Sequence, residues 1–144
     1  MTVRLVKGSD YYVISPLIND WWNGRQMSDL LPKLFFDHFK NTSFIVEEEG
    51  EIIGFLIGFL SQSYSTEAYI HFVGIHPGYR GKGIGKQLYN QFFDVIQQND
   101  RNIVRCVTSS VNKASIAYHT KMGFEIEQGN KANEDKVLFV KYLS

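Results

Sequence analysis

The spacing of apolar residues changes along the chain between the two-residue period of strands and the 3.6-residue period of helices. Residues 3–6 alternate apolar with basic side chains, which predicts a short first strand. A helical pattern follows and contains Pro16. Either Ser15 caps a helix that has Pro16 at its first position, or one turn starting at Asp10 precedes a kink.

Two further patterns fill the next part of the chain. Ser28 or Asp29 can cap a second helix, with Pro32 tolerated in its first turn. Residues 44–48 and 52–60 are apolar runs separated by Glu-Gly, and this arrangement predicts a hairpin.

The remaining elements are a strand over 68–75, a helix over 84–98, a strand over 103–108, a helix from Asn112 to Gly123, and strands over 124–127 and 136–143 around a polar loop. A strand–helix–strand unit of this length implies parallel neighbours joined by a right-handed crossover. The order β-α-α-β-β-β-α-β-α-β-β predicts a single α+β (mixed α/β) domain over residues 1–144, with seven strands in a twisted mixed sheet and four helices.

Composition excludes several classes of protein. Lys plus Arg and Asp plus Glu both number 15, so no basic excess suggests a nucleic-acid partner. The longest apolar run, 52–60, is too short to span a bilayer, and the N-terminal residues lack the apolar segment of a signal peptide. A single cysteine, Cys106, excludes an internal disulfide framework and fits a reducing compartment. We therefore expect a cytoplasmic protein without membrane contact.

The candidate chemistry is concentrated in residues 73–85, where a predicted strand runs into a predicted helix. The first amides of a helix have no intrahelical partner and suit a phosphate, and glycines allow close approach of a pyrophosphate. The alternative is a glycine-rich surface turn. A Walker loop would need Ser or Thr in place of Gln87, and a dinucleotide fingerprint would need Gly in place of Lys86, so both patterns fail.

The stretch Val73-x-Ile75-x-Pro77-x-x-Arg80-Gly-Lys-Gly83-Ile-Gly85 is followed further along by Asn112-x-Ala114-x-x-x-Tyr118-x-x-x-x-Gly123-Phe124. Together they resemble the GNAT superfamily of acyl-CoA-dependent N-acetyltransferases, whose signature [Arg/Gln]-x-x-Gly-x-[Gly/Ala] is satisfied by Arg80, Gly83 and Gly85. The resemblance extends over essentially the whole chain. It implies the GNAT fold, in which strands 4 and 5 splay apart for CoA, and acetyl-CoA as co-substrate.

The resemblance also implies which residues bind the cofactor. The backbone of Val73 and Ile75 would hydrogen-bond the pantetheine arm as in strand addition. The amides at the helix start would hold the pyrophosphate, with Lys82 and Lys86 near the phosphates or simply solvated. The residues implicated are Val73, Ile75, Arg80, Gly81, Lys82, Gly83, Ile84, Gly85, Lys86, Asn112 and Tyr118. Asn112 can also cap a helix, which is compatible with that role.

Three residues are candidates for proton transfer. Tyr118 matches the family's general acid, whose phenol would protonate the leaving thiolate; the alternative is a buried ring packed on Phe124. His71, placed by strand alternation on the face opposite Phe72, is a possible base or a structural hydrogen-bonding residue. Glu67, at the start of the strand, is a weaker base candidate.

In this family the N-terminal helices and last hairpin form the acceptor site, which here includes Trp21, Trp22 and Arg25. Two adjacent Trp residues cannot both face one core, so at least one can line a cleft. No spacing of His, Cys or carboxylates suggests a metal. The leading hypothesis is acetyl transfer from acetyl-CoA to a primary amine of a small molecule or peptide by direct attack in a ternary complex, with a homodimer possible. The alternatives are a non-catalytic CoA-sensing module and a domain that binds ATP or NAD.

Overall fold

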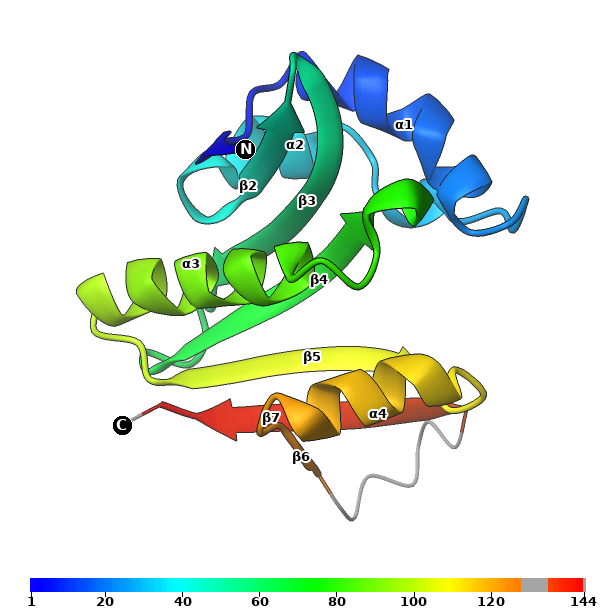
Figure 1. Cartoon of the computed structure of the whole chain (residues 1–144). Helices are drawn as coiled ribbons and strands as arrows, with labels where there is room; N and C mark the ends of the chain where they lie inside the picture. The colour runs from blue at the N-terminus through cyan, green and yellow to red at the C-terminus, as the bar shows by residue number, and fades with distance from the viewer. Residues whose placement is uncertain (128–134, 144) are drawn as a thin grey trace.

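The protein, described here from a computed structural model that covers residues 1–127 and 135–143, is built on a seven-stranded sheet (Figure 1). The strand order is β1-β2-β3-β4-β5-β7-β6; β4 and β5 pair in parallel, and the other neighbouring strands among the described residues pair antiparallel. The elements are β1 Thr2–Leu5, α1 Asp10–Trp21, η1 Ser28–Leu30, α2 Leu34–His38, η2 Lys40–Thr42, β2 Phe44–Glu48, β3 Glu51–Leu60, β4 Glu67–Ile75, η3 Pro77–Tyr79, α3 Ile84–Gln98, β5 Ile103–Ser109, α4 Lys113–Lys121, β6 Glu125–Ile126 and β7 Lys136–Tyr142. The predicted mixed α/β fold is confirmed.

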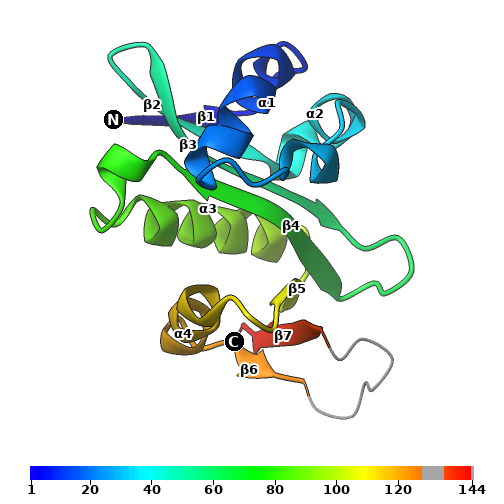
Figure 2. The ribbon, with the colours of Figure 1, turned by 90° about the vertical axis from the view of Figure 1, so that its right-hand side faces the viewer.

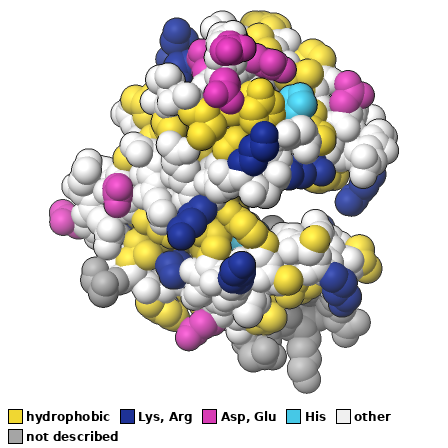
Figure 3. All heavy atoms as spheres, viewed as in Figure 1, with side chains coloured by type: hydrophobic (Ala, Val, Ile, Leu, Met, Phe, Trp, Pro, Cys, Tyr) yellow, Lys and Arg dark blue, Asp and Glu magenta, His cyan; other side chains and the backbone are white. Residues whose placement is uncertain are grey.

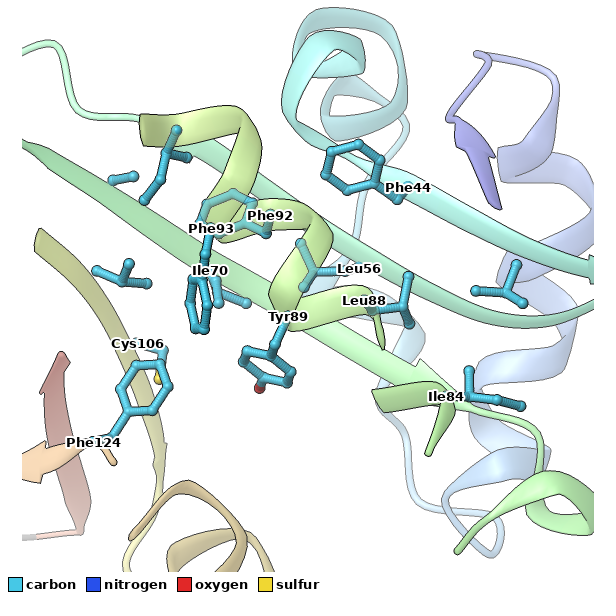
Figure 4. Packing of buried hydrophobic residues seen from close by; sticks show 14 of the residues in the cluster. Phe44, Leu56, Ile70, Ile84, Leu88, Tyr89, Phe92, Phe93, Cys106 and Phe124 are labelled. Atoms are coloured by element: carbon cyan, nitrogen blue, oxygen red, sulfur yellow. The ribbon is translucent and has the colours of Figure 1, made fainter. Parts of the chain in front are cut away.

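Helices cover both faces of the sheet and divide its core in two (Figure 2). The amphipathic helix α3 lies on one face, where Leu88, Phe92 and Ile96 are fully buried against β3, β4 and β5. Figure 4 shows this packing, with α3 side chains beside Leu56 and Ile70 of the sheet. On the other face, Ile14 and Ile18 of α1 and Phe36 of α2 form the second cluster.

Strand β4 contains a bulge that changes which of its side chains point to each face of the sheet. Ile57 of β3 pairs with Phe72 while Gly58 pairs with Ile70, so His71 is an extra residue without a partner in β3. A bulge interrupts strand alternation. Ile70 accordingly packs in the α3 core, whereas both His71 and Phe72 contact residues of the α1–α2 side. The prediction that His71 and Phe72 face opposite sides is therefore wrong, because alternation was assumed to continue unbroken.

Just before the bulge, β4 and β5 separate. Their last paired residues are Tyr69 and Arg105, and the remainder of each strand, up to Ile75 and Ser109, diverges from the other (Figure 1). On its far side β5 stays paired with β7 along its whole length. The predicted splay of strands 4 and 5 is present, and beyond Tyr69 no strand of residues 1–127 or 135–143 pairs with the β5-side edge of β4.

The N-terminal helices differ from the prediction. Helix α1 runs without interruption from Asp10 through Pro16, which agrees with a start at Asp10 rather than a cap at Ser15. The predicted second helix is instead two short pieces, η1 and α2, separated at Pro32, because proline lacks the N–H that a continuous helix needs there. Residues 128–134 of the predicted polar loop lie outside the described residues. Within the described ranges, no helix has the length and apolarity to cross a membrane.

Candidate active site

The glycine-rich segment forms an open backbone loop at the start of α3. Gly81 and Gly83 have φ values of +79° and +82°, in the left-handed region that favours glycine, and Gly83 is the N-cap of α3. A Cβ at either position would meet no atom within 4 Å. Gln87 N is the first helix amide bonded back, to Gly83 O, so the amides of Ile84, Gly85 and Lys86 point out of the helix end. This loop fits an anionic group.

The three cationic side chains of the loop have different surroundings. Lys82 and Lys86 are exposed, and the Lys82 Nζ lies 5.2 Å from the centre of the Tyr79 ring. The Arg80 guanidinium instead donates to the carbonyl oxygen of Trp21 at 2.6 Å. Ile84 contributes only its backbone to the loop, because its side chain lies in the α3 core.

The open edge of β4 presents hydrogen-bonding groups beside this loop. His76 N donates to Ile53 O of β3 at 2.8 Å, and strand alternation therefore directs the N–H and C=O groups of Val73 and Ile75 away from β3, toward β5. Since β5 has diverged here, these groups face a cleft. Figure 3 shows this cleft entering from the side on which the strands part, with Lys and Arg side chains along both of its margins.

Tyr118 of α4 reaches across to the first turn of α3. A Cβ at Gly85 would lie 2.6 Å from the Tyr118 hydroxyl oxygen, so a glycine is required for the phenol to occupy this position. The side chain is 39% exposed, and its ring lies beside those of Tyr89 and His119, so Tyr118 is not the fully buried ring of the structural alternative. Burial of the ring raises the pKa of the phenol, which therefore stays protonated at neutral pH.

Asn112 caps α4, with its Oδ1 accepting from Ser115 N at 3.1 Å. Among the described residues its side-chain amide nitrogen has no partner, so the cap leaves a donor for a ligand in the cleft.

A buried hydrogen-bonded pair, His119 and Tyr89, lies beside Tyr118, and the sequence did not reveal it. His119 Nδ1 donates to Ser115 O at 2.8 Å, which leaves Nε2 to accept from the Tyr89 hydroxyl at 2.8 Å. Burial lowers the pKa of His119 despite the bond to Ser115, so the ring is neutral. The Tyr89 ring lies 5.9 Å from that of Tyr118. The two partners are 30 residues apart, and no local pattern links them.

His71 lies on the acceptor side of β4. Its ring stacks on Phe35 with centres 4.1 Å apart, and Nε2 lies 2.6 Å from Leu30 O. A carbonyl oxygen only accepts, so Nε2 carries the proton and Nδ1 is the basic nitrogen. His71 thus has the structural role of a hydrogen-bond donor to Leu30 O, and its Nδ1 keeps a lone pair that can accept a proton.

Glu67 is poorly placed for the predicted role of base. Its carboxylate accepts from Arg105 Nε at 2.7 Å, and Arg105 also pairs with Glu127. It stands at the start of β4, six residues before Val73, or about 20 Å along an extended strand. An ion-paired carboxylate at that distance cannot reach an amine in the splayed region.

The acceptor-side residues are divided between core and cleft. Trp21 is 4% exposed and stacks on Phe55 in the core, so it does not line a cleft, contrary to its assignment to the acceptor side.

Trp22 is half-buried, with its ring centre 5.1 Å from that of Phe72. A Cβ at Gly74 would lie 3.0 Å from Trp22 Cη2 and 2.5 Å from Phe55 Cε1. Gly74 therefore admits Trp22 over β4; a glycine inside a strand is itself a sequence signal of such close approach. Arg25 is exposed.

Over residues 1–127 and 135–143, no group of three or more His, Cys, Asp or Glu side chains is placed to hold a metal ion. The absence of a metal remains a prediction. Cys106 faces the core, where burial raises the pKa of its thiol to about 12, so it is not poised as a nucleophile.

Comparison with known proteins agrees with this geometry. Residues 11–124 match the model of the acetyltransferase (GNAT) family. The chain is 38% identical over 61 residues to L-2,4-diaminobutyric acid acetyltransferase of Virgibacillus pantothenticus, a match that spans 42% of this chain and only 38% of that enzyme. It is 25% identical over 141 residues to the L-methionine sulfoximine/L-methionine sulfone acetyltransferase of Salmonella typhimurium, covering 88% of this chain and 81% of that one.

The fold also matches solved structures. That of yncA from Salmonella typhimurium with its cofactor acetyl-CoA superposes with a TM-score of 0.73 at 22% identity, covering 100% of this chain and 94% of that one. The loop, the splayed strands and the family match together place the chain in a class of acetyltransferases. The protein belongs to the GNAT family, as the sequence motifs indicated. This assignment argues against the alternative of a domain that binds ATP or NAD.

The neutral, buried His119 predicts a pH dependence of stability. Its pKa is lowered in the folded state, so the unfolded chain takes up a proton first as the pH falls below about 6.5. This contribution is fully present above that pH and is lost as the pH falls toward the folded-state pKa. Urea unfolding from pH 8 to 5 should show it, and His119→Gln, which can keep both hydrogen bonds but does not titrate, should flatten the dependence between pH 6.5 and 5. The exposed His38 gives the matched control, His38→Gln, which should leave the wild-type slope. An unchanged slope in His119→Gln would contradict the assignment.

Proposed function

We propose that this protein transfers an acetyl group from acetyl-CoA to a primary amine by direct attack in a ternary complex. The observation that carries the proposal is the unpaired edge of β4, with a glycine loop at the start of α3 beside it and the Tyr118 hydroxyl against the first turn of that helix. A CoA-sensing module would need the open edge of β4 and the glycine loop, but it would not need a phenol positioned to donate a proton. The placement of Tyr118 therefore favours an enzyme.

The chain's own groups suit each part of the cofactor. The amides of residues 81–86 would bind the pyrophosphate, with Lys82 and Lys86 adding charge at the rim. The backbone groups of Val73 and Ile75 would extend the sheet by pairing with the amide-containing arm. The Asn112 side-chain amide would donate to the same arm.

When bound, acetyl-CoA supplies a thioester at which the amine attacks. A backbone amide of the splayed strand near Val73 would stabilise the developing oxyanion. Tyr118 would give its proton to the leaving sulfur, since burial raises the pKa of its phenol and so keeps the hydroxyl protonated and able to donate to a thiolate. His71, through Nδ1, would accept the proton that the amine must lose, directly or through a water.

The acceptor would enter from the α1–α2 side, where Trp22 lies over Gly74 and Arg25 is exposed. Aromatic faces suit an ammonium group. The relatives named above act on L-2,4-diaminobutyric acid and on L-methionine derivatives. We infer that a small amino-acid-like amine is the acceptor to test first, with peptide amines second. A cytoplasmic location, a homodimer and a single domain over residues 1–144 complete the proposal.

The direct test of the proposal is acetyl-CoA turnover over a panel of amines, read by release of the thiol. The panel includes L-2,4-diaminobutyrate, L-methionine sulfone, other amino acids and short peptides. The proposal predicts release with at least one amine. Tight CoA binding without release for any amine would favour the sensing module instead.

Replacement of Tyr118 by Phe tests the proposed general acid. The variant should bind CoA nearly as tightly as wild type, because the ring remains, while kcat falls by about a hundredfold, within the usual range for loss of general acid–base catalysis. The exposed Tyr64 provides the control Tyr64→Phe, which should retain wild-type kcat. Calorimetry gives the CoA affinity and thiol release gives the rate. Full activity of Tyr118→Phe would remove its assigned role.

The role of His71 as base can be separated from its structural contact. His71→Gln can still donate to Leu30 O but cannot take a proton near neutral pH. We expect kcat/KM for the amine to fall by about tenfold or more and the acid limb of its pH profile to disappear. A pH profile of His71→Gln that keeps the wild-type acid limb would contradict the role of His71 as base and leave it only its hydrogen bond to Leu30 O.

A further inference from the structure

Arg80 belongs to the cofactor loop, yet its side chain is bonded outside that loop. The guanidinium donates to Trp21 O at 2.6 Å, across 59 residues of sequence, in a partly buried setting. Trp21 O is one of the last carbonyls of α1, which have no intrahelical donor, and the last turn of α1 contains no basic residue. Arg80 supplies the missing donor and a favourable positive charge at the negative end of the helix dipole.

A second contact joins the same two segments. The ring of His76, just before the loop, lies 5.7 Å from the Trp21 ring, and His76 Nδ1 accepts from Gly78 N at 2.9 Å. The end of α1 is thus held by the residues that lead from β4 into the glycine loop.

The residue after Trp21 lies on the acceptor side of the reaction centre. The Trp22 ring rests over Gly74 and beside Phe72, on the strand whose open edge faces the cleft. A shift of the Arg80 backbone would therefore move the carbonyl to which its side chain is bonded, and with it the ring that covers the acceptor side of β4.

From this we infer that Arg80 is a positioning residue that couples the cofactor loop to Trp22, so that occupancy of the loop sets the placement of Trp22 and the affinity for the amine. This inference rests on the proposed function. It assigns the Arg80 side chain to the acceptor side, and it leaves phosphate binding to the loop amides, Lys82 and Lys86. By linkage, CoA and the amine should each raise the affinity for the other by the same factor, commonly about five- to a hundredfold for coupled sites.

The two tryptophans of the chain allow a test that does not need turnover. Trp21→Phe keeps an aromatic ring in the core and the backbone carbonyl that Arg80 contacts, and it leaves Trp22 as the one tryptophan, whose fluorescence can be excited selectively over that of tyrosine. In this background CoA should reduce acrylamide quenching of Trp22. Adding Arg80→Ala should raise the quenching of the free protein by about twofold and abolish the response to CoA, while calorimetry shows a CoA affinity within about fivefold of the parent. Arg80→Lys, which still carries a donor, should restore part of the response.

Lys82→Ala in the same background is the matched control from the same loop. It should weaken CoA binding several-fold and preserve the Trp22 response at saturating CoA. With an amine found in the turnover screen, Arg80→Ala should raise the KM for the amine by about tenfold, whereas Lys82→Ala should raise the KM for acetyl-CoA instead.

The outcomes separate this inference from the proposed function. If CoA binds and Trp22 does not respond in the Trp21→Phe parent, or responds equally in Arg80→Ala, the coupling is wrong and the proposed function stands. If Arg80→Ala loses CoA affinity as Lys82→Ala does without affecting the amine, Arg80 is a phosphate ligand and the inference is overturned. If the wild-type protein binds no CoA, both the proposed function and the coupling through Arg80 are wrong.

Discussion

The separation of β4 from β5 is the constraint on which the site depends. A parallel pair that ended together would fill its own hydrogen bonds and leave no room for a ligand between the strands. Here the pairing stops at Tyr69 and Arg105, just before the bulge at His71, and β5 continues paired with β7. The unpaired edge of β4 is tolerable because it opens into a cleft, where its backbone groups can be solvated or bound by a ligand.

The bulge at His71 adds a second change to the same strand. It changes which residues face each side, so that Ile70 packs under α3 while Phe72 and Gly74 face the N-terminal helices. The same strand therefore presents backbone to the cleft and side chains to the acceptor side. Two glycines make the surrounding close contacts possible: Gly85 admits the Tyr118 hydroxyl and Gly74 admits Trp22 and Phe55.

The sequence was most informative where the chemistry is local. The glycine loop, the helix that it starts and the Asn112 cap follow from the residues themselves, because a positive φ and a capping amide act over a few positions. The sequence was less informative where long-range packing decides. Alternation could not show the bulge at His71, helical spacing could not show the burial of Trp21, and neither could show that Glu67 is held by Arg105 or that Tyr89 meets His119. Each of those depends on a partner in another element.

The central claim is that the open edge of β4 receives the arm of CoA as an added strand. Amide hydrogen exchange, resolved by residue with and without CoA, tests this directly. The account predicts that saturating CoA slows exchange strongly at Val73 and Ile75, whose N–H groups point into the cleft, and much less at Gly74, whose N–H lies on the β3 side. Exchange at Val73 and Ile75 that stays unchanged while CoA is bound would contradict it.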